Sequence, residues 1–591
     1  MLDAQESKDP VAVQPPTVAA MTAETKAKTE KGTLGWLRRA HSMACMVVLH
    51  ATKHTGVGIV CAVAYFDPGN WGVDLQAGSE FGYKLLFVVL LAGIFAIFMQ
   101  TQASRLGCVT GLNLASHCRL LLHDRPKHKL LWRWLALYPL YVLAEIAIIS
   151  TDLAELLGSA IALCMLFPTL PLWAGVLLTA SDVLLLLALR DPMRGQPVRM
   201  FELFIAVLVF IVLICMAIII SKARVHWGDA FDGFLPSKTV FRSDALYTSI
   251  GIIGATVMPH SLFLGSALAT QDRLSAAPSP PLKAPTLITV DSTLSTDSDV
   301  TISSTPSASK RGPYSLLEYV IASVRRHFRV LPSTVLPDEP KSHAEHENKP
   351  LAFVRAHLYH GIVDMVVSLL GLAVVINALI LILSAAVFFS GDTGSTGPAS
   401  LFDAYDLLQS SVGKPAAILF ALALLASGQS SSIIATLAGQ IVSEGFIRWR
   451  LSPVMRRLFT RCLGLVPALV VAAGLGRAGI DTLLVASQVI LSIVLPFIVF
   501  PLLWLTSSKS VMSVKKPVER ATAPAPVSSG DGASPAHTDS PPDAALALEE
   551  QFETVDFSIG KITTGVGYAI WLVIVMANVY AIVGLGLGEG V

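Results

Sequence analysis

The chain of 591 residues is 53% hydrophobic and only 14% charged, with a formal net charge of +1. Soluble domains carry about 25% charged residues, so this composition excludes an ordinary soluble protein and predicts a chain surrounded mainly by lipid. The net charge gives no reason to expect a nucleic acid partner. The seven cysteines form no CxxC pair, and we interpret them as small core residues, not as a disulfide or zinc framework.

Three polar regions separate the apolar ones. The N-terminal region has no apolar stretch typical of a signal peptide, and two internal regions are rich in Pro, Ser, Ala and Thr. All three are expected to be disordered and cytosolic, and ubiquitin ligases or trafficking adaptors are expected to dock on the cytosolic loops. The predicted organisation is a tail at 1–50, transmembrane helices 1–6 at 51–270, a loop at 271–350, helices 7–10 at 351–505, a loop at 506–560, and an eleventh helix with the C-terminus at 561–591.

Eleven stretches are long and apolar enough to cross a bilayer as helices, which takes about 20 residues each. Lys and Arg cluster before the first stretch and after the second, fourth, eighth and tenth. Because cytoplasmic loops collect positive charge, the N-terminus is predicted in the cytosol and the C-terminus on the opposite side. The plasma membrane, the vacuole and the endosome all fit this topology. The predicted spans are 56–78, 84–106, 133–157, 158–189 (with a loop near 168–171), 198–221, 244–269, 356–389, 415–445, 459–476, 482–505 and 563–587.

Two of these spans contain polar, helix-breaking motifs. In the first span the motif is Asp67-Pro68-Gly69-Asn70, and in the sixth it is Met258-Pro259-His260. Proline removes a backbone donor and clashes with the preceding turn. Broken helices at matching places in two halves predict a midplane binding site in an inverted-repeat transporter. The predicted fold is therefore an all-α polytopic membrane protein with a 5+5 inverted repeat plus an eleventh helix.

The broken segments offer an unusual set of metal ligands. Asp67 supplies a carboxylate, Asn70 an amide oxygen, Met258 a thioether, and Ala255 a carbonyl freed by the break. A thioether contributes little to Mg²⁺ or Ca²⁺ and favours transition metals. A single kink is more often structural than functional, and Met258 alone is more often explained by core packing. Asp67 is different, because an ionisable group at membrane depth costs at least ~2.5–3.5 kcal/mol.

The third span carries three carboxylates, at Glu145, Asp152 and Glu155. At about 100° per residue they fall within roughly an 80° sector of one helix face. A proton relay and a structural ion-pair network both remain open for this row. His260 can titrate near neutral pH, or it can hydrogen-bond backbone freed at the kink.

Other polar residues in the spans have plainer interpretations. Asn377 and Gln429 are explained as well by hydrogen bonds between helices as by the lining of a vestibule. Asp364 is expected to be hydrated near the cytosolic end of its helix, with no role in transport.

Together these motifs resemble those of the NRAMP family of proton-coupled divalent-metal transporters, over about residues 56–505. The run from Met258 to Ser266 is most similar to the fungal branch, whose members mainly handle manganese. The resemblance implies a LeuT-like fold and symport of Mn²⁺ or Fe²⁺ with protons into the cytosol by alternating access, with no permanently bound cofactor. The motifs that carry it are Asp67-Pro68-Gly69-Asn70, Met258-Pro259-His260, Ala144-Glu145, Thr151-Asp152-Leu153-Ala154-Glu155, Gly428-Gln429-Ser430-Ser431 and Ala438-Gly439-Gln440.

The resemblance also implies roles for individual residues. Arg461 would be the salt-bridge partner of the acidic row. Gly265 departs from the family, since many relatives carry a second His there. The implied metal ligands are Asp67, Asn70, Ala255, Met258 and Gln488, and the implied proton pathway is His260, Glu145, Asp152 and Glu155.

Two rival functions remain at this stage. One is a Na⁺-coupled transporter of a small organic solute with the same architecture, although Asp67 beside the kink disfavours an anionic substrate. The other is a metal sensor that does not transport and that signals through the cytosolic loops. An enzyme is not expected, because the sequence shows no nucleophile–base set and no nucleotide motif.

Overall fold

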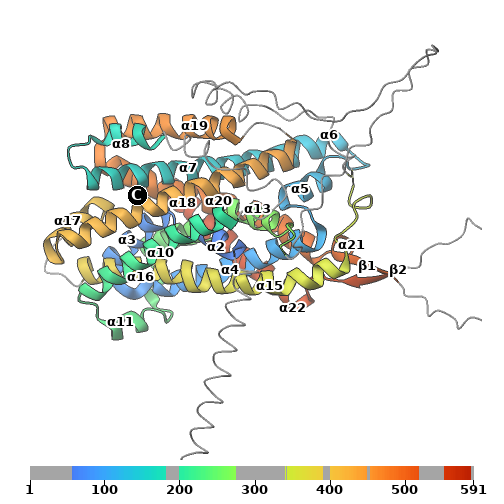
Figure 1. The fold of residues 1–591 in the computed structure, drawn as a ribbon, viewed down its shortest axis with the longest axis horizontal. Coiled ribbons are helices and arrows are strands. Elements are labelled where there is room, and N and C mark those ends of the chain that lie inside the picture. Colours follow the sequence, from blue (N-terminus) through green and yellow to red (C-terminus); the bar gives the residue numbers. More distant parts are fainter. Residues whose placement is uncertain are drawn as a thin grey trace, which may run out of the picture. The chain divides into compact units, whose positions relative to one another are not determined.

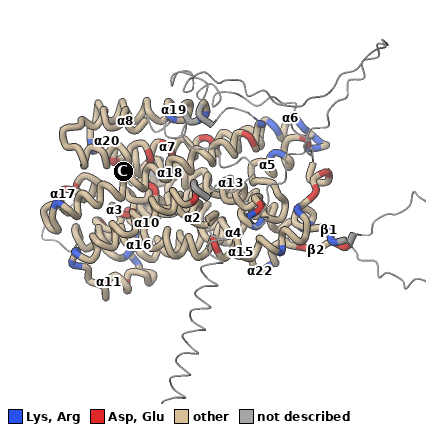
Figure 2. The backbone as a smooth tube through the Cα atoms, viewed as in Figure 1, with Lys and Arg blue, Asp and Glu red and all other residues tan. Residues whose placement is uncertain are grey.

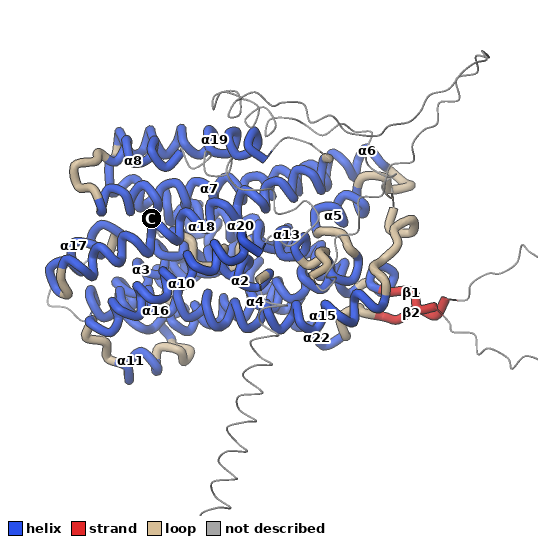
Figure 3. The backbone as a smooth tube through the Cα atoms, viewed as in Figure 1, coloured by secondary structure: helices blue, strands red, loops and turns tan. Residues whose placement is uncertain are grey.

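The computed structural model describes residues 56–180, 199–273, 340, 342–389, 399–448, 453–517 and 552–587 (Figure 1). The tail predicted at 1–50 and most of the loops predicted at 271–350 and 506–560 lie outside these residues. The described part is helical except for loops and one small sheet (Figure 3). The predicted all-α class is therefore confirmed.

The first half of the described chain ends with the sixth span. Its first span consists of two helices, α2 and α3, and its sixth span also consists of two, α12 and α13. The elements are α2 Val57–Val63, α3 Pro68–Phe81, η1 Gly82–Leu85, α4 Leu86–Thr110, α5 Leu114–Leu122, α6 Lys129–Trp132, η2 Arg133–Leu137, α7 Tyr138–Leu166, α8 Leu172–Thr179, α10 Arg199–Lys222, α11 Trp227–Asp232, η4 Lys238–Phe241, α12 Ser243–Thr256 and α13 Pro259–Leu268.

In the second half, four consecutive elements form one helical rod of 39 residues, from Leu351 to Phe389. Two short antiparallel strands lie between the last two long helices in the chain, and they pair Ser513 with Asp556 and Pro517 with Phe552. The elements are α15 Leu351–Ser368, η6 Leu369–Val374, α16 Val375–Ser384, η7 Ala385–Phe389, α17 Leu401–Ser411, α18 Lys414–Ile447, α19 Pro453–Gly474, α20 Gly476–Ser507, α21 Lys509–Met512, β1 Ser513–Pro517, β2 Phe552–Asp556 and α22 Lys561–Leu587.

Eight helices of the described part are long and apolar enough to cross a membrane, and Leu458–Gly474 is a shorter apolar helix. The fourth predicted span runs on beyond residue 180, outside the described residues, so the count of eleven stays a prediction. The predicted boundary between the third and fourth spans at residues 157 and 158 is wrong. Helix α7 continues to Leu166 because residues 158–166 contain no proline, and the break comes at Phe167–Pro171.

The outer surface of the helices suits lipid. Large apolar side chains are exposed along α10, α19 and α22, for example Val207, Val470 and Leu572. Figure 2 shows Lys and Arg mainly at helix ends and in loops, with a few acidic positions inside the bundle. In water so much exposed apolar surface would cause aggregation, whereas in a bilayer it is the surface expected to face the lipid chains.

Both interrupted helices restart at a proline. Pro68 and Pro259 occupy the first turns of α3 and α13, where the missing N–H is no loss. Neither proline can donate to the carbonyl four residues earlier, so the preceding helix ends. These are the breaks predicted in the first and sixth spans.

Small residues allow the first break to lie deep in the bundle. A Cβ added to Gly158 of α7 would lie 2.0 Å from Cβ of Pro68, and one added to Gly428 of α18 would lie 3.3 Å from Cγ of Pro68. Pro68 is therefore held between α7 and α18, which lie side by side in Figure 1.

We expect Gly158→Ala to destabilise the protein, because the new methyl group cannot fit beside Pro68. Overpacking of this kind typically costs about 1–3 kcal/mol. Thermal unfolding of the detergent-solubilised protein would measure it, with Gly228→Ala as the control, since a Cβ there meets nothing within 4 Å. Equal melting temperatures of the two variants would contradict this packing.

Candidate metal centre

Asp67 lies at the first break with its side chain fully buried. It is the N-cap of α3, and its Oδ1 accepts from the backbone N–H of Asn70 at 3.0 Å and from Nδ2 of Asn70 at 2.7 Å. The other carboxylate oxygen, Oδ2, has no hydrogen-bond partner in the described residues. A buried carboxylate with an unsatisfied oxygen is costly unless a cation or a proton is available to it.

The second break contributes a backbone oxygen to the same place. Nδ2 of Asn70 also donates to the carbonyl oxygen of Ala255, at 2.9 Å. Within a helix that carbonyl would accept from residue 259, but residue 259 is proline. The carbonyl therefore points out of the helix, and Asn70 joins it to Asp67 across the two broken helices.

A third helix fixes Asn70 from the other side. Asn377 of α16 donates from Nδ2 to the carbonyl of Tyr65 at 2.7 Å and to Oδ1 of Asn70 at 3.4 Å. The side chain is buried and its Oδ1 has no hydrogen-bond partner in the described residues. Of the two interpretations left open for Asn377, the structure shows the hydrogen bond between helices, directly beside the candidate site.

Gln488 and Met258 complete the predicted ligand set. Gln488 of α20 is buried against Gly69, where an added Cβ would lie 1.9 Å from its Nε2. Its Oε1 has no hydrogen-bond partner in the described residues. Met258 is fully buried at the N-cap of α13, inside the second break and three residues after Ala255. Of the five predicted ligands, Asn70 is the one that hydrogen-bonds directly to two others, Asp67 and Ala255.

The acidic row on α7 is paired with two arginines of α19. Glu145 accepts from Nη2 of Arg456 at 2.7 and 2.9 Å. Oδ1 of Asp152 lies 3.3 Å from Nη1 of Arg461, and Nη2 of Arg461 donates to Oγ of Ser432 at 2.7 Å. Arg461 therefore contacts the row at Asp152, as the resemblance implies. Arg456 was not identified from the sequence, although it lies five residues before Arg461 on the same helix.

His260 connects the second break to this row. Its Nδ1 lies 3.2 Å from Oγ1 of Thr151, whose hydroxyl donates to the carbonyl of Ala147 at 3.0 Å. The threonine oxygen is therefore the acceptor, and Nδ1 of His260 is the donor. His260 thus bonds to α7 next to Asp152, and the hydrogen bond considered above, to backbone freed at the kink, is not the one observed. Glu155, one turn further along, is fully buried.

The position of the second family histidine is filled by another side chain. A Cβ on Gly265 would lie 1.7 Å from Nε2 of Gln100. Gln100 donates to the carbonyl of Ser261 at 3.3 Å and accepts from the hydroxyl of Tyr65 at 3.1 Å. Gly265 therefore leaves room for a glutamine that joins the end of α2 to α13.

The expectation that Asp364 is hydrated is wrong. Its side chain is buried, and Oδ2 accepts from the backbone N–H groups of Gly58 at 2.7 Å and Gly56 at 3.3 Å. Amides in the first turn of a helix have no partner within that helix. Asp364 of α15 supplies one, and so ties the start of α2 to the neighbouring rod.

Comparison with known proteins agrees with this geometry. A family model described as Natural resistance-associated macrophage protein-like matches residues 58–304 and 339–519. The chain belongs to this family. The NRAMP chain described here is 41% identical to the manganese transporter pdt1 of Schizosaccharomyces pombe over 540 residues, covering 91% of this chain and 86% of the relative.

Two further comparisons are with an iron transporter and with a solved structure. The iron transporter SMF3 of Saccharomyces cerevisiae is 35% identical, covering 91% of this chain and 97% of its own length. Among solved structures, the NRAMP chain is similar to the Eremococcus coleocola manganese transporter, with 26% identity and a TM-score of 0.59, covering 88% of this chain and 84% of that one. Membership of this family of membrane transporters also means that the chain is not an enzyme.

We expect Asn377→Leu to weaken Mn²⁺ binding about tenfold or more, because the residues that orient metal ligands typically contribute 10–100-fold to affinity. Calorimetric titration of the purified protein would measure the change. Asn578→Leu is the matched control, since Asn578 is also buried and also donates to two carbonyls, those of Ser492 and Ile574. Equal losses in both variants would mean that Asn377 acts on stability alone.

Proposed function

We propose that this protein carries Mn²⁺ or Fe²⁺, together with protons, across its membrane into the cytosol by alternating access. The observation that carries the proposal is the contact of Asp67, Asn70 and the Ala255 carbonyl where two interrupted helices meet. The names of the relatives support it, since they include manganese transporters and an iron transporter. The metal is the transported substrate, so no permanently bound cofactor is proposed.

The proposed ligands are Asp67, Asn70, the Ala255 carbonyl and Met258, with Gln488 joining in some conformations. In the structure the Asn70 amide group donates to Asp67 and Ala255 at 2.7 and 2.9 Å. A divalent cation at this place would replace those N–H groups as the partner of both oxygens. Asn70 would then turn its oxygen to the metal, and the free Oδ2 of Asp67 would be the strongest additional donor.

The ligand set also accounts for selectivity. Only one of the proposed ligands is negatively charged, and the others are neutral oxygens and one sulfur. The bound 2+ ion therefore keeps part of its charge, which suits a site that must release its ion. Sulfur binds poorly to Ca²⁺ and Mg²⁺ and better to transition metals. Met258 is thus proposed to exclude the more abundant hard cations.

Protons are proposed to travel along α7. Metal binding requires ionised Asp67, so arrival of the metal displaces or redirects a proton. His260 lies at the second break and bonds to Thr151 of α7. From there Asp152, Glu155 and Glu145, with Arg461 and Arg456 beside them, provide charged groups for onward transfer toward the cytosol.

The orientation is proposed from the distribution of Lys and Arg, with the N-terminus cytosolic and the C-terminus on the opposite side. The membrane is proposed to be the plasma, vacuolar or endosomal membrane. The segments at 271–350 and 506–560 are proposed as docking sites for ubiquitin ligases or trafficking adaptors.

We expect Asp67→Asn to reduce Mn²⁺ uptake into proteoliposomes to the level of protein-free vesicles. The change keeps the size of the side chain and removes the only carboxylate among the proposed ligands. Asp229→Asn is the control, because Asp229 is exposed on α11. Normal uptake by Asp67→Asn would refute the site.

Asp152→Asn should affect protons more than metal. The amide keeps the shape of the side chain but cannot carry a proton, so we expect proton influx to fall several-fold while Mn²⁺ affinity stays within about twofold of the wild type. A pH-sensitive dye inside proteoliposomes, read together with Mn²⁺ uptake, would test this. Proton flux equal to that of Asp229→Asn would rule out Asp152 as a relay.

A further inference from the structure

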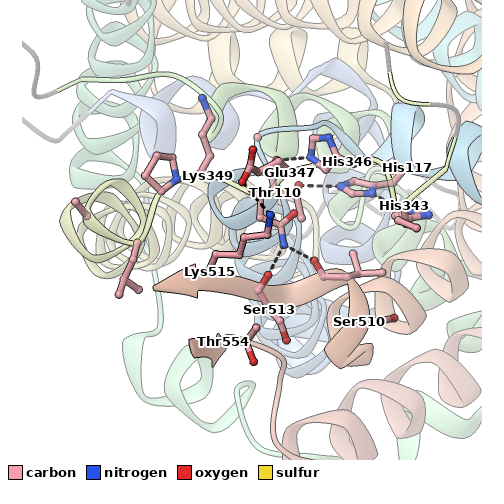
Figure 4. Close-up of a pocket in the computed structure, with 17 residues that line it drawn as sticks. Thr110, His117, His343, His346, Glu347, Lys349, Ser510, Ser513, Lys515 and Thr554 are labelled. Atoms are coloured by element: carbon pink, nitrogen blue, oxygen red, sulfur yellow. Dashed lines mark hydrogen bonds and ion pairs between the residues drawn. The ribbon is translucent and has the colours of Figure 1, made fainter. Parts of the chain in front are cut away.

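Three histidines gather away from the transport site, at the end of α4. His117 belongs to α5, and His343 and His346 lie in the turn that precedes α15. With Glu347 and Lys515 they line a cavity of about 970 Å³. Figure 4 shows the three imidazoles together beside Thr110.

The hydrogen bonds determine which ring nitrogens carry hydrogen. Nε2 of His346 lies 2.7 Å from the carbonyl oxygen of Thr110, which can only accept. The Thr110 hydroxyl donates to the carbonyl of Leu106 at 2.7 Å, so it accepts from Nε2 of His117 at 2.8 Å. Nδ1 of His117 is then the acceptor for Nε2 of His343, at 3.0 Å.

It follows that Nδ1 of His343 and Nδ1 of His346 each hold a lone pair. No hydrogen bond to either atom is present among the described residues. Burial, and then the neighbouring His346, lowers the pKa of His343 to about 4. Burial and the two other imidazoles hold the pKa of His117 well below its usual range. A ring nitrogen with a free lone pair is the atom through which imidazole binds metal.

We propose that His343 and His346 bind a divalent transition-metal ion through Nδ1, with the Glu347 carboxylate as the third ligand. Two imidazoles and one carboxylate form a set that binds Fe²⁺ and similar ions. Ligating histidines usually donate their second N–H to a carbonyl or another acceptor, which fixes the ring. Here His346 donates its Nε2–H to the Thr110 carbonyl, and His343 donates its Nε2–H to Nδ1 of His117.

Glu347 must move for the site to close. In the described residues no three His, Cys, Asp or Glu side chains surround one point as the structure stands. Oε1 of Glu347 lies 3.3 Å from Nζ of Lys515, and both side chains are more than half exposed. An exposed ion pair of this kind contributes little to stability, so a 2+ ion held by two imidazoles can draw Glu347 away from it.

Hydrogen bonds connect this site to the helix bundle. The backbone N–H of Lys349 donates to the carbonyl of Val109 at 3.0 Å, and Asn348 donates to the carbonyl of Ser513 at 2.7 Å. The segment thus joins the end of α4, the start of α15 and β1. In the proposed topology this is the cytosolic face, so the site would bind metal in the compartment that receives the transported ion. Only this placement depends on the proposed function.

The test uses the full chain carrying Asp67→Asn, so that the proposed transport site cannot contribute. Co²⁺ is the probe, because its visible absorption reports nitrogen and carboxylate ligation. We expect one bound Co²⁺ per chain, lost when His343→Ala and His346→Ala are added, and kept when His226→Ala, an exposed histidine before α11, is added instead. Glu347→Gln changes an exposed side chain, is safe for folding, and should weaken binding about tenfold or more.

Two results would overturn the proposal. One is a parent that binds no Co²⁺, and the other is unchanged binding after both histidines are replaced. Mn²⁺ uptake by the wild-type protein is measured separately, so failure of the transport proposal would be seen there, whichever way the Co²⁺ titration turns out.

Discussion

The missing N–H of proline is the constraint on which this site depends. Pro259 cannot satisfy the carbonyl of Ala255, and Pro68 cannot satisfy that of Ala64. In a bilayer an unsatisfied carbonyl is tolerated only where protein or water donates a hydrogen bond to it or an ion binds it. Asn70 does so for Ala255, at 2.9 Å, and the same amide group holds Asp67. The interrupted helices therefore create a polar centre inside an apolar bundle and also determine which atoms face it.

The rest of the bundle holds that centre in place. Gly158 and Gly428 let Pro68 press against α7 and α18, while Asn377 holds Asn70 from α16. At the N-terminal end of α2, the Asp364 carboxylate accepts hydrogen bonds from the backbone N–H groups of the first turn. The short helix α2 is thus attached at both ends by hydrogen bonds, with few residues between them. Such an element can move as a rigid unit if those bonds are exchanged, which alternating access requires of a helix next to the ion.

The sequence predicted the parts of this site that are local. A proline beside polar residues predicts each break, and the helical spacing of the three carboxylates predicts that they share one face of α7. The partners that lie far away in the chain could not be predicted. Asn377 contacts Asn70 across 307 positions, and Arg456 pairs with Glu145 across 311. Asp364 was misjudged for the same reason, since its partners, Gly56 and Gly58, are about 300 residues away. The predicted boundary at residues 157 and 158 lies nine residues before the end of α7, whereas the loop predicted near residues 168–171 matches the break between α7 and α8.

The proposed link between metal and protons rests on distance and electrostatics. His260 follows Met258 by two residues and donates to Thr151, the residue next to Asp152 in α7. A 2+ charge beside Asp67 would raise the cost of any additional proton on His260, since like charges at short range repel strongly where water is scarce. The carboxylates of α7 could receive that proton, and two of them, Asp152 and Glu145, pair with Arg461 and Arg456. A carboxylate that bonds to an arginine keeps further lone pairs, and these can accept hydrogen bonds on a proton route. In this view the ion pairs on α7 and the proton route are one device, and the two interpretations that the sequence left open for the acidic row are compatible.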